Sequence, residues 1–154
     1  MAEQQKDNFK YIVRVANVDI PGEKPIRIAL TKIKGIGINL ASVVCTLAGV
    51  NKTVKTGNLS DKDVVSLNSV VSDPLKHGLP TWFVNRQKDF ETGETNHLLT
   101  GKLQYTQEND LKRLKKIKTL RGVRHQKGLT VRGQRTRSNF RKSKGKVIGV
   151  SKKK

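Results

Sequence analysis

Hydrophobic residues along the first 120 positions recur at spacings that predict one strand and four helices. An imperfect apolar–polar alternation over residues 9–20, followed by a Pro-Gly pair, predicts a strand that ends in a turn. Pro25 then opens a short amphipathic helix, and Gly35 and Gly37 separate it from a second helix over residues 38–48. The pattern therefore indicates a mainly α fold with a short β element.

Two further helices are predicted in the middle of the chain. Ser60 is a typical N-cap, with Asp63 three residues later as its capping-box partner, and an Asp-Pro pair ends this third helix. The Thr-Gly pair within residues 88–97 predicts a hairpin turn, and a fourth helix over residues 106–120 carries leucine or isoleucine at every third position from Leu111. The core is expected to contain the apolar positions of the four helices together with Trp82 and Phe83.

Charge divides the chain more sharply than hydropathy does. The formal net charge is +20, from 32 Lys and Arg against 12 Asp and Glu, and a charge of this size indicates a polyanionic partner. From Leu111 to Lys154 there are 18 basic residues and no acid. The glycine-punctuated end has too few apolar residues to fold alone, so we predict two parts, a helical domain of residues 1–120 and a long basic extended arm of residues 121–154 that orders on RNA.

Several classes of protein are excluded by what the sequence lacks. The longest mainly apolar stretch, residues 40–50, is about half of the ~20 residues that a membrane span needs, and the polar N-terminus shows no secretory signal. A single cysteine, Cys45, cannot form an internal disulfide and is expected to be a buried structural thiol. We find no catalytic constellation and predict no enzyme activity, cofactor, metal site or membrane; the histidines lie far apart at His77, His97 and His125.

The turn between the first two helices is one candidate binding site. Gly35 and Gly37 allow the backbone to turn tightly and to approach a partner, and the N–H groups that open the second helix form an anion site. Lys32 and Lys34 flank the turn, as in a helix-hairpin-helix phosphate clamp. The alternative is a plain helix–helix turn with glycine at the C-cap.

The arm is the second candidate site. Its first part is rich in arginine, whose planar guanidinium suits bidentate contacts to phosphates and base edges. A solvated charge run is the alternative, but no acidic residue lies nearby to balance it. Aromatic residues are scarce, so binding is expected to depend on phosphate and shape. The candidate residues are Arg121, Arg124, His125, Arg132, Arg135, Arg137 and Arg141.

Two stretches carry a resemblance to a known family. Residues 121–136, RGVRHQKGLTVRGQRT, resemble the signature of the universal ribosomal protein numbered thirteen in the bacterial small subunit and eighteen in the eukaryotic one, and residues 29–37, ALTKIKGIG, are similar to its N-terminal motif. The resemblance is continuous from about Phe9 to Lys154. Residues 79–89 and 149–154 resemble the archaeal and eukaryotic branch, whereas Phe140 departs from the small residue that relatives tend to have.

The resemblance implies a structural protein of the small-subunit head, in the cytoplasm, with an N-terminal domain of the helix-two-turns-helix type and an arm that threads through rRNA. It implies as partners small-subunit rRNA, head protein nineteen, large-subunit protein five and large-subunit rRNA across intersubunit bridges, and P-site tRNA. The rRNA-binding residues carried over are Lys34, Gly35, Gly37, Arg121, Arg124, His125, Arg132, Arg135, Arg137 and Arg141, to which the turn adds Lys32, and the tRNA-binding residues are Lys152, Lys153 and Lys154.

Two other classes of function are alternatives to this one. A DNA-repair enzyme could use the same turn to hold duplex DNA, but it would be expected to carry a catalytic N-terminus or a cysteine-rich zinc element, and neither is present. A nucleoid-packaging protein would bind DNA without regard to its structure. Competition between rRNA fragments and random duplex DNA separates that function from rRNA binding.

Overall fold

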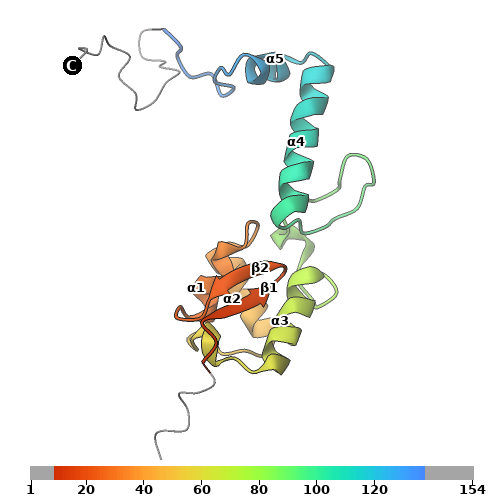
Figure 1. Ribbon diagram of the computed structural model, residues 1–154. Helices are drawn as coiled ribbons and strands as arrows, with labels where there is room; N and C mark the ends of the chain where they lie inside the picture. Colours follow the sequence, from red (N-terminus) through yellow and green to blue (C-terminus); the bar gives the residue numbers. More distant parts are fainter. Residues whose placement is uncertain (1–8, 138–154) are drawn as a thin grey trace, which may run out of the picture. The chain divides into compact units, whose positions relative to one another are not determined.

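The computed structural model describes residues 9–137 and is mainly helical with one small sheet (Figure 1). It divides into two compact units, residues 1–105 and residues 106–154, and each is described here by itself. Three short 3-10 turns join the main elements, at Leu30–Lys32, Thr56–Asn58 and Thr81–Phe83. The strands are β1 (Ile12–Val15) and β2 (Val18–Pro21), and the helices are α1 (Ile26–Ala29), α2 (Ile38–Leu47), α3 (Asp61–Ser72), α4 (Thr100–Lys116) and α5 (Leu120–Gln126).

The segment predicted as one strand is a β-hairpin. β1 and β2 pair antiparallel, with Val15 opposite Val18. Ala16 and Asn17 form the two-residue turn, and their φ values of +48° and +60° are those of the turn types that suit a twisted hairpin. The prediction missed this turn because Ala-Asn lacks the glycine that usually marks it. The amide of Ala16 donates to Oδ1 of Asn68 on α3 at 2.8 Å, which ties the hairpin to the helical layer.

The three helices of the first unit follow the predicted pattern closely. α1 continues as a 3-10 turn before the two glycines, and α2 begins at Ile38 as predicted and ends at Leu47. The side chain of Ser60 accepts from the amide of Asp63, and Asp63 accepts in return from the amide of Ser60, so the predicted capping box of α3 is confirmed. Ala41 is fully buried where α1 and α2 pack together.

The hydrophobic core of the described residues lies between Val13 and Val84. Cys45 is fully buried, as predicted, and burial raises the pKa of its thiol. The expectation that Trp82 lies in the core is wrong, because its side chain is 71% exposed. A short 3-10 turn at residues 81–83 points successive side chains in different directions, so that Phe83 is half-buried and Val84 is the residue that reaches the core.

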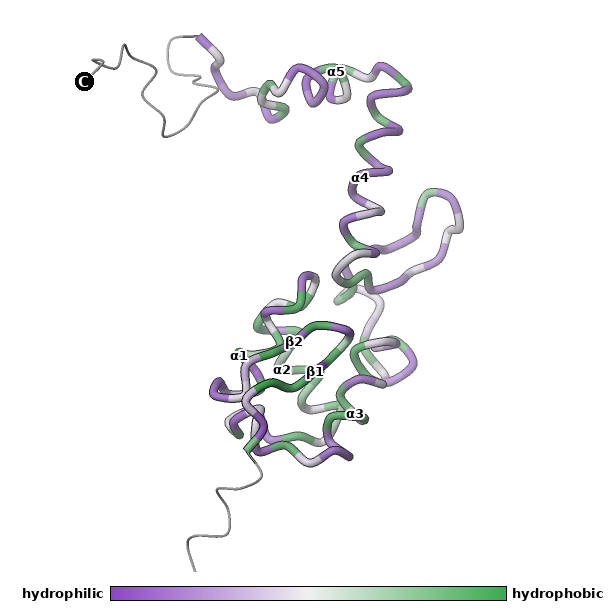
Figure 2. Tube along the Cα trace, viewed as in Figure 1, coloured by the Kyte–Doolittle hydropathy of each residue, from purple (hydrophilic) through white to green (hydrophobic). Residues whose placement is uncertain are grey.

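The helical corner of the second unit differs from the prediction. α4 begins six residues earlier than expected, at Thr100, and ends at Lys116 rather than residue 120. Lys118 then adopts φ +56°, and Thr119 caps α5, a helix that the sequence pattern did not predict. The expectation that the apolar positions of residues 106–120 lie in the core is wrong, because the described residues of this unit contain no buried hydrophobic side chain. Figure 2 shows that hydrophilic residues predominate along α4 and α5.

Candidate nucleic-acid interface

Gly35 is required by the fold of the turn between α1 and α2. Its φ of +107° is strained for any residue with a side chain, and a Cβ at this position would lie 2.6 Å from the carbonyl oxygen of Leu98. The Gly35 carbonyl accepts a hydrogen bond from Nε2 of His97 at 3.1 Å, and the neighbouring Lys34 carbonyl accepts from the amide of Thr100 at 2.8 Å. The close approach that Gly35 permits is therefore to the protein's own chain.

Gly37, by contrast, faces solvent. It is the N-cap of α2, no side chain caps the helix there, and no atom lies within 4 Å of the position that a Cβ would take. The first turn of α2 holds no acidic residue, so its free N–H groups and the positive end of the helix dipole favour an anion. Lys34 is exposed beside this site, whereas Lys32 donates from Nζ to the carbonyl of Asp19 at 2.7 Å.

His97 holds the turn through its hydrogen bond to the Gly35 carbonyl. Its Nδ1 atom is buried without a hydrogen-bond partner, while Nε2 bonds to a carbonyl, which can only accept. The neutral ring with its proton on Nε2 fits both facts. Burial lowers the pKa of His97, and the bond to Gly35 opposes that effect only in part.

This histidine predicts a pH dependence of folding stability. Because the folded pKa of His97 lies below the ordinary value of about 6.5, the unfolded chain takes up the proton first as pH falls. The stability that neutral His97 contributes is therefore lost as pH falls from about 6.5 through the folded pKa. We expect His97→Gln, which can still donate to Gly35, to show a smaller fall in Tm between pH 7.5 and pH 5 than the wild type. His77→Gln, at an exposed site, should match the wild-type fall. Equal falls in all three proteins would contradict this role.

A cationic corner forms where α4 ends and α5 begins. The basic residues in the last turns of α4 suit the negative end of its dipole, and none of the acidic residues of the chain lies beyond Asp110. These basic residues were not among the predicted contacts. The absence of any acidic residue after residue 110 is the signal in the sequence that could have identified them. These residues are Lys112, Arg113, Lys115, Lys116 and Lys118.

Gly122 joins α5 closely to the end of α4. It is buried, and a Cβ there would overlap the carbonyl oxygen of Leu114. The hydroxyl of Thr119 donates to that carbonyl at 3.2 Å and accepts from the amide of Gly122 at 3.0 Å. The glycine of the Arg-Gly pair that opens the arm motif is therefore explained by contact between helices within the second unit.

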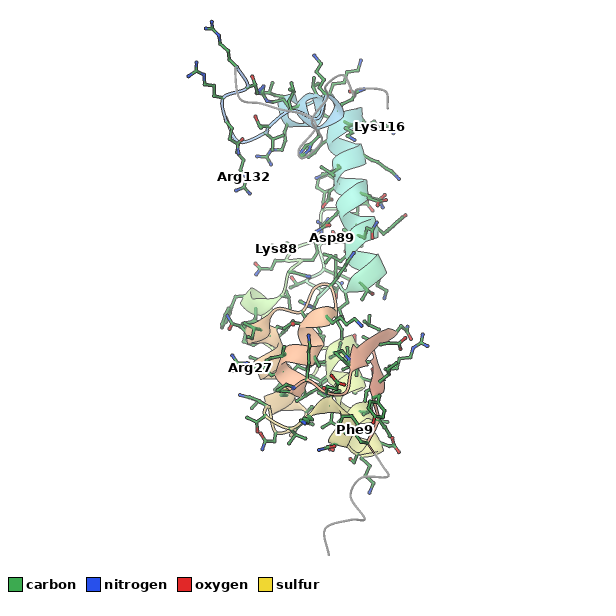
Figure 3. All side chains as sticks on the ribbon, turned by 60° about the vertical axis from the view of Figure 1, so that its left-hand side comes forward. Phe9, Arg27, Lys88, Asp89, Lys116 and Arg132 are labelled. Carbon is green, nitrogen blue, oxygen red and sulfur yellow. The ribbon has the colours of Figure 1, made fainter. Side chains whose placement is uncertain are left out.

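Arg124 organises the loop after α5. Its Nε donates to the carbonyl of Thr130 at 2.6 Å, and the Thr130 hydroxyl donates to the carbonyl of Gln134 at 3.2 Å. The side chain of Gln134 in turn accepts from the amide of Arg132 at 3.2 Å. The loop thus holds its backbone by its own bonds and leaves Arg132, Arg135 and Arg137 exposed; Figure 3 labels Arg132 on this loop.

Arg124 and Arg121 form a matched pair for a test of this arrangement. We expect Arg124→Gln to speed amide exchange across residues 128–134 on the order of tenfold, because a hydrogen bond from a charged donor contributes about 1.5–3 kcal/mol. Arg121→Gln removes the same charge from an exposed site of α5 and should leave exchange unchanged. Hydrogen exchange read by mass spectrometry compares the two. Equal exchange in both variants would contradict a positioning role for Arg124.

The predicted contacts are divided between the two units. Lys34 and Gly37 lie in the first unit, while Arg121, His125 and the exposed arginines of the loop lie in the second. Within residues 9–137 no cluster of acidic, cysteine and histidine side chains could hold a metal ion, and no helix there is long and apolar enough to span a membrane. Phe140, Arg141, Lys152, Lys153 and Lys154 lie outside the described residues.

Comparison with known proteins identifies close relatives over almost the whole chain. The family model described as ribosomal protein S13/S18 matches residues 14–142. The chain is 47% identical to small ribosomal subunit protein uS13 of Methanopyrus kandleri over 96% of this chain and 97% of the relative. It is 45% identical to the uS13 protein of Nanoarchaeum equitans over 94% of each chain, and 42% identical to that of Methanothermobacter thermautotrophicus over 97% and 99%. These archaeal relatives agree with the branch that the sequence resembles.

Proposed function

Since the chain belongs to the ribosomal protein S13/S18 family, we propose that it binds small-subunit rRNA through the α2 N-terminus and the basic arm, and that it also contacts the large subunit and P-site tRNA. As a member of this family it is a structural constituent of the small ribosomal subunit in the cytoplasm and not an enzyme. Its partner is small-subunit rRNA.

The first proposed contact is a phosphate at the start of α2. The open space around Gly37 lets a phosphate oxygen approach the free N–H groups of the first helical turn. Lys34 supplies a positive charge beside it, and Lys32 lies on the same turn. Gly35 contributes indirectly, because it sets the path of the turn rather than the space for the phosphate.

The second contact extends over the arm. The single observation that carries it is that the described residues of the second unit combine an excess of basic residues with no buried hydrophobic side chain. Such a segment gains little stability from its own packing. Binding to RNA phosphates would neutralise its positive charges, for which its sequence provides no acidic partners. Arg121, His125, Arg132, Arg135 and Arg137 are proposed as direct contacts, Arg124 as a residue that positions the loop, and Arg141 as a further contact.

The finer partners are proposed from the family resemblance. They are head protein nineteen, large-subunit protein five and large-subunit rRNA across intersubunit bridges, and P-site tRNA. Lys152, Lys153 and Lys154 are proposed to touch tRNA phosphates. Small subunits that carry glutamine at these three positions should bind P-site tRNA more weakly in a filter-binding assay, whereas unchanged affinity would contradict this contact.

The rRNA proposal is tested by competition and crosslinking. The full-length protein should select small-subunit rRNA fragments over random duplex DNA at equal phosphate concentration. Crosslinks from the arm in assembled subunits should map to small-subunit rRNA. Equal competition by duplex DNA would favour a packaging function, and crosslinks confined to protein would contradict the arm's proposed role.

A further inference from the structure

Two large aromatic side chains are exposed on the segment that joins α3 to α4. Trp82 is 71% exposed and Phe90 is 70% exposed. Burial of a tryptophan or phenylalanine removes about 150–250 Å² from water, so each of them is a strong potential anchor. Both lie within residues 80–98, here called the aromatic loop, whose ends pack against the first unit through Val84 and Leu98 while its middle projects from it (Figure 1). Nothing in the rRNA-binding proposal uses them.

The aromatic loop is held in one shape by its own hydrogen bonds. The side-chain amide of Asn85 pairs with both backbone groups of Leu98 at 2.8 Å, and Arg86 pairs through its backbone with Asn96. Gln87 donates from Nε2 to the carbonyl of Trp82 at 3.1 Å. The indole itself rests edge-on against Phe83, with ring centroids 5.3 Å apart. A surface that is ordered before binding loses little conformational entropy when a partner arrives.

The charge of the aromatic loop is opposite in sign to that of the rest of the chain. It contains three acidic residues and two basic ones, in a protein of net charge +20. Nε of Arg86 bonds to Oδ1 of Asp89 at 2.6 Å, so these two charges are paired with each other. Lys88, Glu91 and Glu94 are the exposed charges that remain, and Figure 3 labels Lys88 and Asp89 on this loop. A net negative surface repels RNA phosphates and attracts a basic partner.

We propose that the aromatic loop is a docking surface for a basic segment of a neighbouring protein in the small subunit, with Trp82 and Phe90 as its apolar anchors. Aromatic anchors at the centre and charged residues at the rim are the usual anatomy of a protein–protein interface. Glu91 and Glu94 face the lysines and arginines of the partner. The inference rests on the chain's place in the small subunit and adds a protein contact to the rRNA contacts proposed above.

Site-specific photocrosslinking in assembled small subunits tests the inference. The photoreactive residue p-benzoylphenylalanine replaces Trp82 or Phe90, and in the control it replaces Tyr11, which directly precedes β1 and is 72% exposed. We expect the first two positions to give an adduct with one and the same protein, through a peptide rich in Lys and Arg. An adduct with rRNA, with an acidic peptide, with the same protein from position 11, or no adduct at all would overturn the proposal.

Reversing the charge of the acidic residues in the aromatic loop distinguishes a basic protein partner from RNA, because the two should change the crosslink yield in opposite directions. The double variant Glu91→Lys with Glu94→Lys should lower the crosslink yield from position 82 about tenfold if the partner is basic. It should raise the yield if the partner is RNA, and that result, like an unchanged yield, would overturn the proposal. Glu23→Lys, an exposed acid elsewhere, is the matched control. Co-sedimentation of the wild-type chain is measured first, since its failure would count against the small-subunit role rather than against the docking surface.

Discussion

Removal of residues 121–154 is expected to release the protein from small subunits while its first unit stays folded. Every buried hydrophobic residue of the described chain lies between Val13 and Val84, so the deletion removes none of the core. It removes most of the basic residues beyond Asp110, including all the proposed arm contacts. Sedimentation through a salt-containing sucrose cushion measures retention, and circular dichroism of the purified truncated chain measures folding. Full retention of the truncated chain would contradict the proposal.

The loss of small-subunit binding should be electrostatic in origin. If about eight arm cations neutralise phosphates, log affinity should fall with log salt concentration at a slope of roughly −5 to −7, at about 0.7–0.9 per phosphate. Replacing Arg132, Arg135 and Arg137 by glutamine should reduce the magnitude of that slope by about 2–3. Arg124→Gln should weaken binding as well, but through the order of the loop. A slope that these variants leave unchanged would rule out phosphate contacts at the three exposed arginines.

Local signals in the sequence predicted the elements that local interactions determine. The capping box at Ser60 and the start of α2 at Ile38 need only neighbouring residues, and both predictions are confirmed. The turn at Ala16 and Asn17 was missed because it lacks the usual glycine, and part of what stabilises it comes from outside the hairpin, from Asn68 on α3. Likewise α5 has little apolar periodicity, and its start depends on Thr119 and the buried Gly122 against α4.

The sequence predicts a set of candidate residues but does not assign a role to each. Basic residues and glycines indicate phosphate binding, because these residue types suit it wherever they lie. Which of them face a ligand depends on contacts between distant segments. The sequence treats Arg121 and Arg124 alike, yet only Arg124 bonds to the carbonyl of Thr130. Trp82 was expected in the core because tryptophan is usually buried, and its exposure follows from the turn at residues 81–83.

Gly35 and Gly37 give the sharpest contrast of this kind, and alanine at each position should separate their roles. Gly35→Ala places a Cβ 2.6 Å from the carbonyl oxygen of Leu98 at φ +107°, which we expect to cost about 3 kcal/mol of folding stability. For a unit of this size that corresponds to a fall in Tm on the order of 10–20 °C. Gly37→Ala meets no atom within 4 Å and should cost at most about 1 kcal/mol, as a change at an N-cap does.

Direct loss of rRNA binding is expected at Gly37, the position where alanine costs less stability. In Gly37→Ala the new methyl group lies where a phosphate would approach the first turn of α2, so rRNA affinity should fall although the fold is intact. Thermal unfolding followed by circular dichroism gives the stability of both variants, and filter binding of rRNA fragments gives the affinity of Gly37→Ala below its Tm. If Gly37→Ala bound as tightly as the wild type, the α2 N-terminus would not be a phosphate site. If Gly35→Ala were as stable as the wild type, close approach to Leu98 would not be the reason for glycine there.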